Sequence, residues 1–124
     1  MASQGRAYYD YIVVGAGTAG CIVASRLTED PRISVLLLEA GSSDVNDFRV
    51  KNPTQILSCI GSEIDWKYKT VPQKNALKGY KNNVCDWPRG KVLGGSSSIN
   101  GMAWVRGHYA DYDSWAKQGC TGWG

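Results

Sequence analysis

The sequence predicts an α/β fold organised around one parallel βαβ unit, and three observations near the start of the chain support this. Residues 11–14 form a short apolar run rich in β-branched side chains, which is typical of a parallel strand buried on both faces. A second apolar run follows at 33–38. Between them, at 19–27, apolar residues return at i, i+3, i+4 and i+7, the period of an amphipathic helix. This order favours a parallel crossover.

Three glycines stand where the first strand meets the helix, with the spacing GxGxxG. Gly15 permits a tight turn, Gly17 has no Cβ to hold off a pyrophosphate, and Gly20 lets the helix lie close on the strand. The free amides at the start of the helix face an anion. A glycine-rich turn without a ligand is the alternative, but the surrounding strands and helix favour an adenine-dinucleotide site.

The end of the second strand carries an acidic residue that refines this interpretation. Pro31 ends the preceding helix, because proline cannot continue it. Glu39 then follows Gly20 by nineteen residues, where a carboxylate accepts both hydroxyls of an adenosine ribose. Its charge repels a 2′-phosphate, so NADP is disfavoured. The motif alone does not separate NAD from FAD.

The remaining elements are less regular. Residues 65–71 alternate large or β-branched side chains with charged ones, which predicts a half-exposed edge strand stopped by Pro72. The other expected segments are a surface loop at 41–47, a weak helical patch at 54–59, a polar excursion at 73–86, and a helix at 110–118 that ends at Gly119 and places Tyr112, Trp115 and Ala116 on one face.

A second glycine-rich stretch occupies residues 87–102. Gly94 and Gly95 allow a sharp turn and close approach by a ligand, and the serines at 96–98 are strong N-caps for a helix beginning there. Arg89 offers a donor fork suited to phosphate, and Asn100, one turn into the expected helix, offers an amide to a polar heterocycle. An ordinary Gly-Ser loop with a helix cap is the alternative.

Composition bounds the remaining possibilities. The 124 residues, 43% of them hydrophobic, fit one small globular domain, and no apolar run is long enough to cross a bilayer. Residues 1–6 lack the apolar stretch of a signal peptide, so we expect a cytosolic protein or a trimmed chain.

The four cysteines do not indicate a metal site. Cys21, Cys59, Cys85 and Cys120 are widely spaced, and only His108 could join them as a soft ligand. Cys21 follows a glycine in the packed first turn of the helix, where we expect a small buried thiol. A disulfide among the other three stays open, and one cysteine would then remain unpaired.

The net charge of +3 is concentrated in one segment. Residues 67–91 hold seven basic residues against the single acid Asp86. Lys74, Lys78 and Lys81 flank glycine and asparagine, which favours a solvated loop over a docking patch. The segment has neither the aromatic interleaving nor the zinc spacing of nucleic-acid-binding modules, so no nucleic-acid partner is expected.

Two signatures resemble the glucose-methanol-choline (GMC) oxidoreductases, flavoenzymes that bind FAD. The first is YDYIVVGAGTAG with the later LLLEAG, and the second runs from Gly90 to Asp113. The segments DWKYKT, WPRGKVLGG and RGHYADYDSW are similar to the glucose dehydrogenase and choline dehydrogenase branches of animals. The resemblance covers nearly the whole chain and implies FAD rather than NAD.

The resemblance also implies roles by position. Residues that would wrap the pyrophosphate are Gly15, Gly17, Thr18, Ala19 and Gly20; Glu39 and Ala40 would hold the adenosine end; Arg89, Val92, Gly95 and Ser96 would pass along the cofactor; and Asn100, Gly101, Met102 and Ala103 would lie against the isoalloxazine. Some relatives tether the flavin through a histidine where this chain has Ile99. The FAD is therefore expected to be non-covalent.

The implied reaction is oxidation of a small-molecule alcohol by hydride transfer to FAD, with the electron acceptor left open. The family's catalytic histidine, with its partner histidine or asparagine, comes from beyond position 124, and His108 does not match it. We therefore expect residues 1–124 to be the N-terminal part of a GMC-type FAD-binding domain, incomplete on its own, inactive alone and without catalytic residues. A flavin-scaffold lyase, of the hydroxynitrile lyase or fatty acid decarboxylase type, and a non-catalytic FAD-binding fragment are the alternatives.

Overall fold

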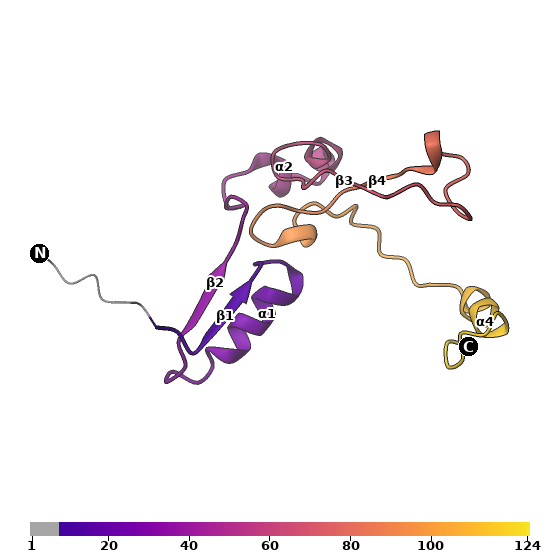
Figure 1. Cartoon of the computed structure of the whole chain (residues 1–124). Coiled ribbons are helices and arrows are strands. Elements are labelled where there is room, and N and C mark those ends of the chain that lie inside the picture. Colours follow the sequence, from indigo (N-terminus) through magenta and orange to yellow (C-terminus); the bar gives the residue numbers. More distant parts are fainter. Residues whose placement is uncertain (1–7) are drawn as a thin grey trace, which may run out of the picture.

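The computed structural model describes residues 8–124, and its first part is the expected βαβ unit (Figure 1). Strand β1 (Tyr11–Val14) leads through the glycine turn into helix α1 (Thr18–Leu27), and β2 (Val35–Leu38) returns beside β1. The two strands pair in parallel, from Tyr11 opposite Val35 to Val14 opposite Leu38. The second strand thus begins two residues later than predicted. The N-terminal segment 1–6 lies outside the described residues.

Short helices follow, and the first of them begins at a side-chain cap. Helix α2 (Phe48–Lys51) is capped by Asp47, whose carboxylate accepts a bond of 2.9 Å from the Arg49 amide. A 3₁₀ turn (Pro53–Gln55) runs into α3 (Ile56–Cys59). The helical patch predicted at 54–59 is confirmed. Helix α2 was not predicted, because four residues are too few to show a helical period.

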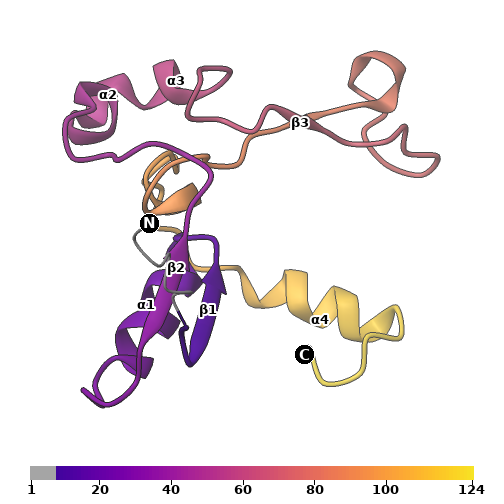
Figure 2. The ribbon, with the colours of Figure 1, turned by 60° about the vertical axis from the view of Figure 1, so that its left-hand side comes forward.

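The next segment forms a narrow antiparallel arm that extends away from the βαβ unit (Figures 1 and 2). Its strands are β3 (Tyr68–Lys69) and β4 (Asp86–Trp87), and Asp65 also pairs with Gly90. The strand predicted at 65–71 was therefore too long, because Lys67 takes a left-handed conformation (φ 55°) that interrupts it. The polar excursion contains a 3₁₀ turn (Lys81–Asn83) and ends where β4 begins, at Asp86. Its lysines are exposed, as predicted.

The helix predicted to begin at Ser96 is wrong. The structure has only a 3₁₀ turn (Gly95–Ser97), and Asn100 lies beyond it. The Asn100 side chain donates to the Ser97 carbonyl and accepts from the Met102 amide, both at 2.6 Å. Met102 has a φ of 54°, so the backbone leaves the helical region there.

Helix α4 (Tyr109–Lys117) stands apart from the rest, after an extended segment (Figures 1 and 2). Nδ1 of His108 accepts a bond of 3.2 Å from the Ala110 amide, so this histidine is an N-cap. Gly119 follows the helix with a φ of 101°, as its predicted stop requires. Tyr112, Trp115 and Trp123 form edge-to-face pairs, but α4 contacts no other helix or strand of residues 8–124.

The buried side chains gather around the short helices and the arm rather than around the sheet. Cys59, Ile64, Val92 and Ile99 form one cluster, with Val50 packed against it. In contrast, Ile12 of β1 is 60% exposed. The prediction that the strands are buried on both faces is therefore wrong for the described chain, because one helix covers the two-stranded sheet. Apolar side chains on the sheet faces therefore stay uncovered within residues 8–124.

The cysteines are all free thiols, so no disulfide joins them. Cys21 is exposed, against the prediction of a buried thiol. Its Sγ lies 3.2 Å from the Ala16 carbonyl. The structurally described part of the chain shows no cluster of three metal-ligating side chains and no helix of sufficient length and apolarity for a bilayer.

The loop predicted to lie at the surface at 41–47 is partly packed. Ser42 pairs with Val92, and the Leu93 amide donates to the Ser42 carbonyl at 2.9 Å. A Cβ at Gly41 would overlap the backbone of Lys91. The second glycine stretch is thereby held against the end of β2.

Candidate dinucleotide site

A cavity of about 700 Å³ opens at the carboxyl ends of β1 and β2. This edge of a parallel sheet is where ligands bind in open α/β folds. The cavity is lined by residues from four parts of the chain: Val14, Gly15, Gly17, Thr18, Leu38, Glu39, Ala40, Trp66, Tyr68, Arg89, Gly90, Gly95 and Ser96.

The first glycine turn has the geometry that its sequence predicts. Gly15 has a φ of 96°, and its amide donates to the Leu38 carbonyl at 2.7 Å. A Cβ at Gly20 would overlap the Gly15 carbonyl oxygen, so the helix can start this close to the turn only with glycine there. Gly17 lines the cavity, and a Cβ on it would find no atom nearer than Gly95 Cα at 3.8 Å. The turn therefore presents bare backbone.

The two glycine turns, distant in sequence, touch one another. The Gly94 amide donates to the Ala16 carbonyl at 2.8 Å, and a Cβ on Gly95 would come within 2.7 Å of Gly17 Cα. Gly94 and Gly95 both have positive φ, so the predicted sharp turn is confirmed. Both turns border the same cavity.

The start of α1 supplies donors to this cavity. Its N-cap, Gly17, makes no side-chain cap bond, and the first turn carries no acidic residue. The first amides of an α-helix have no acceptor within the helix, and the aligned peptide dipoles add partial positive charge. This donor set suits an anion such as a phosphate.

Glu39 ties the first turn to the end of β2. Its Oε2 accepts from the Ala16 amide and its Oε1 from the Gly41 amide, both at 2.8 Å. A carboxylate oxygen accepts more than one bond, so both oxygens retain capacity toward the cavity. Sequence reasoning assigned Glu39 to a ribose and did not foresee this second role.

Two aromatic residues of the arm also belong to the cavity wall, and they were not among the predicted site residues. Trp66 and Tyr68 line the cavity together with Arg89. The Arg89 guanidinium donates to the Pro88 carbonyl at 2.6 Å and lies 5.2 Å from the centre of the Trp87 ring. The alternating pattern at 65–71 indicated a strand, and only tertiary structure shows that one of its sides faces the glycine turns.

A buried carboxylate holds this wall in place. Asp65 is 4% exposed and accepts backbone bonds from Gly61 (2.8 Å), Lys67 (2.9 Å) and Arg89 (3.0 Å). Burial acts to raise the pKa of Asp65, but the three amide donors outweigh it and hold the pKa below its ordinary value. The charged form therefore stabilises the base of the arm.

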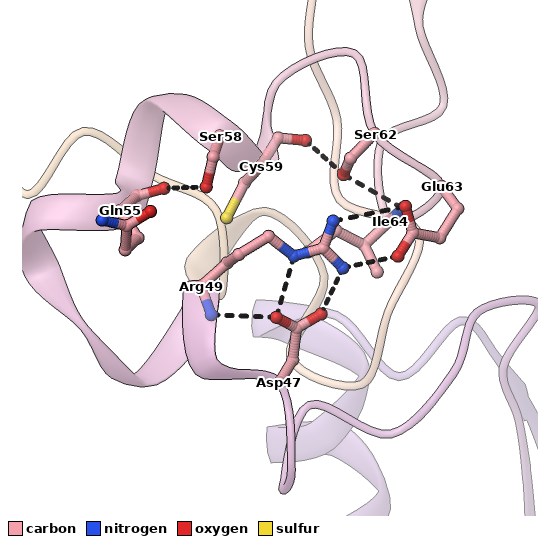
Figure 3. A network of polar contacts seen from close by, with 8 residues as sticks. All are labelled: Asp47, Arg49, Gln55, Ser58, Cys59, Ser62, Glu63 and Ile64. Carbon is pink, nitrogen blue, oxygen red and sulfur yellow. Dashed lines mark hydrogen bonds and ion pairs between the residues drawn. The ribbon is translucent and has the colours of Figure 1, made fainter.

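An ion-pair network lies at the short helices (Figure 3). Arg49 pairs with both Asp47 and Glu63, and this lowers the pKa of each carboxyl group. Burial raises the pKa of the nearby Cys59 thiol, so the thiol stays neutral. None of these residues lines the main cavity, and we assign the network a structural role.

The cavity brings together eight of the predicted site residues: Gly15, Gly17, Thr18, Glu39, Ala40, Arg89, Gly95 and Ser96. The others lie outside it. Val92 is part of the buried cluster, and Asn100 and Met102 border a separate cavity of about 200 Å³. Gly101 and Ala103 are exposed. Ala19 and Gly20 belong to α1 behind the turn.

Comparison with known proteins places the chain in a class, the oxidoreductases. The family model described as GMC oxidoreductase matches residues 9–124. The chain therefore belongs to the GMC oxidoreductase family, as its two signatures suggested.

Similar proteins include several dehydrogenases. A glucose dehydrogenase (FAD, quinone) of Drosophila pseudoobscura pseudoobscura is 50% identical over 93% of this chain and 18% of its own length. A mitochondrial choline dehydrogenase of Mus musculus is 45% identical over 99% and 21%. The chain thus spans about a fifth of the length of these curated relatives.

Solved structures show the same fold. A pyridoxine 4-oxidase from Mesorbium loti matches with a TM-score of 0.69 and 37% identity, over 89% of this chain and 21% of that one. A formate oxidase matches with a TM-score of 0.66 and 40% identity, over 86% and 18%.

Proposed function

We propose that this chain is the FAD-binding part of a flavin-dependent oxidoreductase that acts on the CH–OH group of a small alcohol. Membership of the GMC family and relatives named for FAD, glucose and choline support this. The observation that carries it is the contact between the two glycine turns beside one cavity at the strand ends. In this reading the βαβ unit is a Rossmann-like dinucleotide-binding unit.

The residues present fit the cofactor. Bare backbone at Gly15 and Gly17, with the uncapped start of α1, would hold the pyrophosphate. Glu39 and Ala40 would receive the adenosine ribose, and Arg89 would add a charge-assisted donor to phosphate. A bound FAD would supply the acceptor for the hydride of the alcohol carbon. The described residues bind and orient the cofactor, and we assign none of them a catalytic role.

The isoalloxazine contacts remain a separate part of the proposal. Asn100, Gly101, Met102 and Ala103 lie after the second turn, outside the main cavity. The Asn100 side chain holds the Met102 amide at 2.6 Å, so the backbone of this stretch is locally constrained. Ile99 is buried in the core cluster, which supports a non-covalent flavin.

The test compares two glycine-to-valine variants. Gly17→Val places a side chain in the cavity, so the purified protein should lose its flavin absorbance. Gly79→Val is the control, because that glycine has open space around it and no positive φ. The proposal fails if the Gly17→Val protein retains FAD with unchanged absorbance and affinity.

A further inference from the structure

The outer end of the arm carries positive charge that no neighbouring acidic residue balances. Residues 66–85 include five lysines and neither aspartate nor glutamate. Three of these lysines, Lys74, Lys78 and Lys81, belong to the tip of the arm, which we define as residues 72–83. All three are exposed, and none forms an ion pair within residues 8–124. Their charges therefore face solvent in the described chain.

The backbone presents the tip away from the βαβ unit (Figures 1 and 2). The Gln73 amide donates to the Asn83 carbonyl at 3.1 Å, and this bond closes the hairpin across the tip. Within the tip, the Tyr80 amide donates to the Leu77 carbonyl at 2.9 Å, and the Asn83 amide donates to the Tyr80 carbonyl at 3.0 Å. The three lysines are thus gathered on one folded turn at a projecting end of the described chain.

Exposed apolar side chains accompany these lysines. Tyr80 stands between Lys78 and Lys81 and is 53% exposed, and Val71, just before the tip, is 72% exposed. A tyrosine ring with its polar end is favoured at the boundary between lipid and water. Lysine stems also lie along apolar surface while the ammonium group stays in water. The sequence pattern alone favoured a solvated loop, and the structure adds this combination at one end of the arm.

The type of cation distinguishes a lipid surface from an acidic protein as the partner. Arginine has a planar fork of donors that matches a fixed carboxylate, whereas lysine is a compact point charge on a flexible stem. The tip contains lysines and no arginine. Mobile point charges suit a partner whose own charges are spread over a surface and can move, as the headgroups of a bilayer can.

We propose that the tip of the arm docks on a membrane surface rich in anionic lipids, with Lys74, Lys78 and Lys81 at the headgroups and the Tyr80 ring between them. Each lysine close to such a surface strengthens binding by about fivefold, so the three together contribute roughly a hundredfold. This attraction extends only over a Debye length, about 10 Å at 0.1 M salt. It therefore depends on the lysines at the tip rather than on the net charge of the whole chain.

Co-sedimentation with vesicles tests this docking. At about 0.1 M salt, the protein should bind vesicles of phosphatidylcholine that contain about 30% phosphatidylserine, and it should not bind vesicles of phosphatidylcholine alone. The tip variant, with Lys74→Gln, Lys78→Gln and Lys81→Gln, should bind the anionic vesicles roughly a hundredfold more weakly. No tip residue lines the main cavity, so this variant should keep its affinity for FAD, and the docking and the proposed function can fail independently.

The matched control removes three cations that are exposed elsewhere, with Lys51→Gln, Arg106→Gln and Lys117→Gln. Both triple variants lose the same charge, but the control should keep the vesicle affinity of the wild type. Equal weakening of the two variants would mean that net charge alone governs binding, and unchanged binding of the tip variant would mean that the tip is not involved. Either result would overturn the proposal.

Two measurements on the unaltered protein do not depend on how the variants fold. Binding to the anionic vesicles should fall at least tenfold when the salt is raised to about 1 M, because the Debye length shrinks to about 3 Å. Binding that persists at this salt concentration would contradict the electrostatic docking. Binding to polyglutamate without binding to anionic vesicles would assign the tip to an acidic protein and would also overturn the proposal.

Discussion

The βαβ unit and the segment from the short helices to the second glycine turn are stabilised in different ways. The βαβ unit, residues 9–40, has regular strands and a helix, yet Ile12 stays largely exposed. The later segment has little regular structure, yet it holds the cluster of Cys59, Ile64, Val92 and Ile99. Regular backbone pairing and side-chain burial are thus separated along this chain. The stability of the first region depends on the close approach of its backbone segments. The stability of the second depends on the burial of its apolar side chains.

The largest effect is expected from blocking backbone approach in the βαβ unit. Gly20→Val would force a side chain into the Gly15 carbonyl, which cannot move without breaking the turn. We expect a loss on the order of 4 kcal/mol or more in the free energy of unfolding. Urea denaturation followed by circular dichroism measures it, with Gly79→Val as the control. A loss below about 1 kcal/mol would contradict the close approach.

A pair of isoleucines compares burial in the two regions directly. Ile64 is 1% exposed, so Ile64→Ala should cost about 2–5 kcal/mol of unfolding free energy, because it leaves a cavity in the cluster. Ile12→Ala removes the same atoms from an exposed strand position and should cost less than about 1 kcal/mol. Equal losses of unfolding free energy for the two variants in the same assay would show that Ile12 is as buried as Ile64. The two regions would then not differ in side-chain burial.

The buried carboxylate of the second region predicts a pH dependence. The folded-state pKa of Asp65 lies below the unfolded value of about 3.9, so its contribution to stability is present above that pH and is lost as the pH falls through the folded value. Asp65→Asn should cost about 1–3 kcal/mol at neutral pH, because the amide cannot satisfy three donors as the carboxylate does.

The difference between wild type and Asp65→Asn isolates this group from the other acids. That difference in unfolding free energy should shrink as the pH is lowered from 6 toward 2, since the wild-type carboxyl becomes protonated. A difference that stays constant across this range would mean that the charge of Asp65 contributes nothing to the arm.

The smallest effect on flavin attachment is expected from a substitution at Ile99, which belongs to the buried cluster. Because its side chain offers no nucleophile and packs in the core, we predict that acid precipitation releases all bound flavin into the supernatant. Ile99→Val, which keeps the packing nearly intact, should behave in the same way. Flavin absorbance that remains in the washed pellet would contradict a non-covalent site.

Local sequence pattern was sufficient for the first region. Apolar runs, a helical period and glycine spacing predicted the βαβ unit, because strand and helix formation and the steric freedom of Gly15 depend on neighbouring residues. It was insufficient where a long-range contact overrides the pattern. The helix expected at Ser96 stops as a 3₁₀ turn. Cys21 is exposed, although a buried thiol was expected in the packed first turn of α1.

The sequence by itself therefore determined the family, the two glycine turns and the acidic end of β2. Each of these features is a short motif with particular residue types at fixed positions. Only the tertiary structure decided that these turns touch, that Glu39 also binds the Ala16 amide, and that Trp66 and Tyr68 complete the cavity. The physical reason is distance along the chain. Contacts between residues that are far apart in sequence depend on how the intervening backbone folds back, and no local period encodes that path.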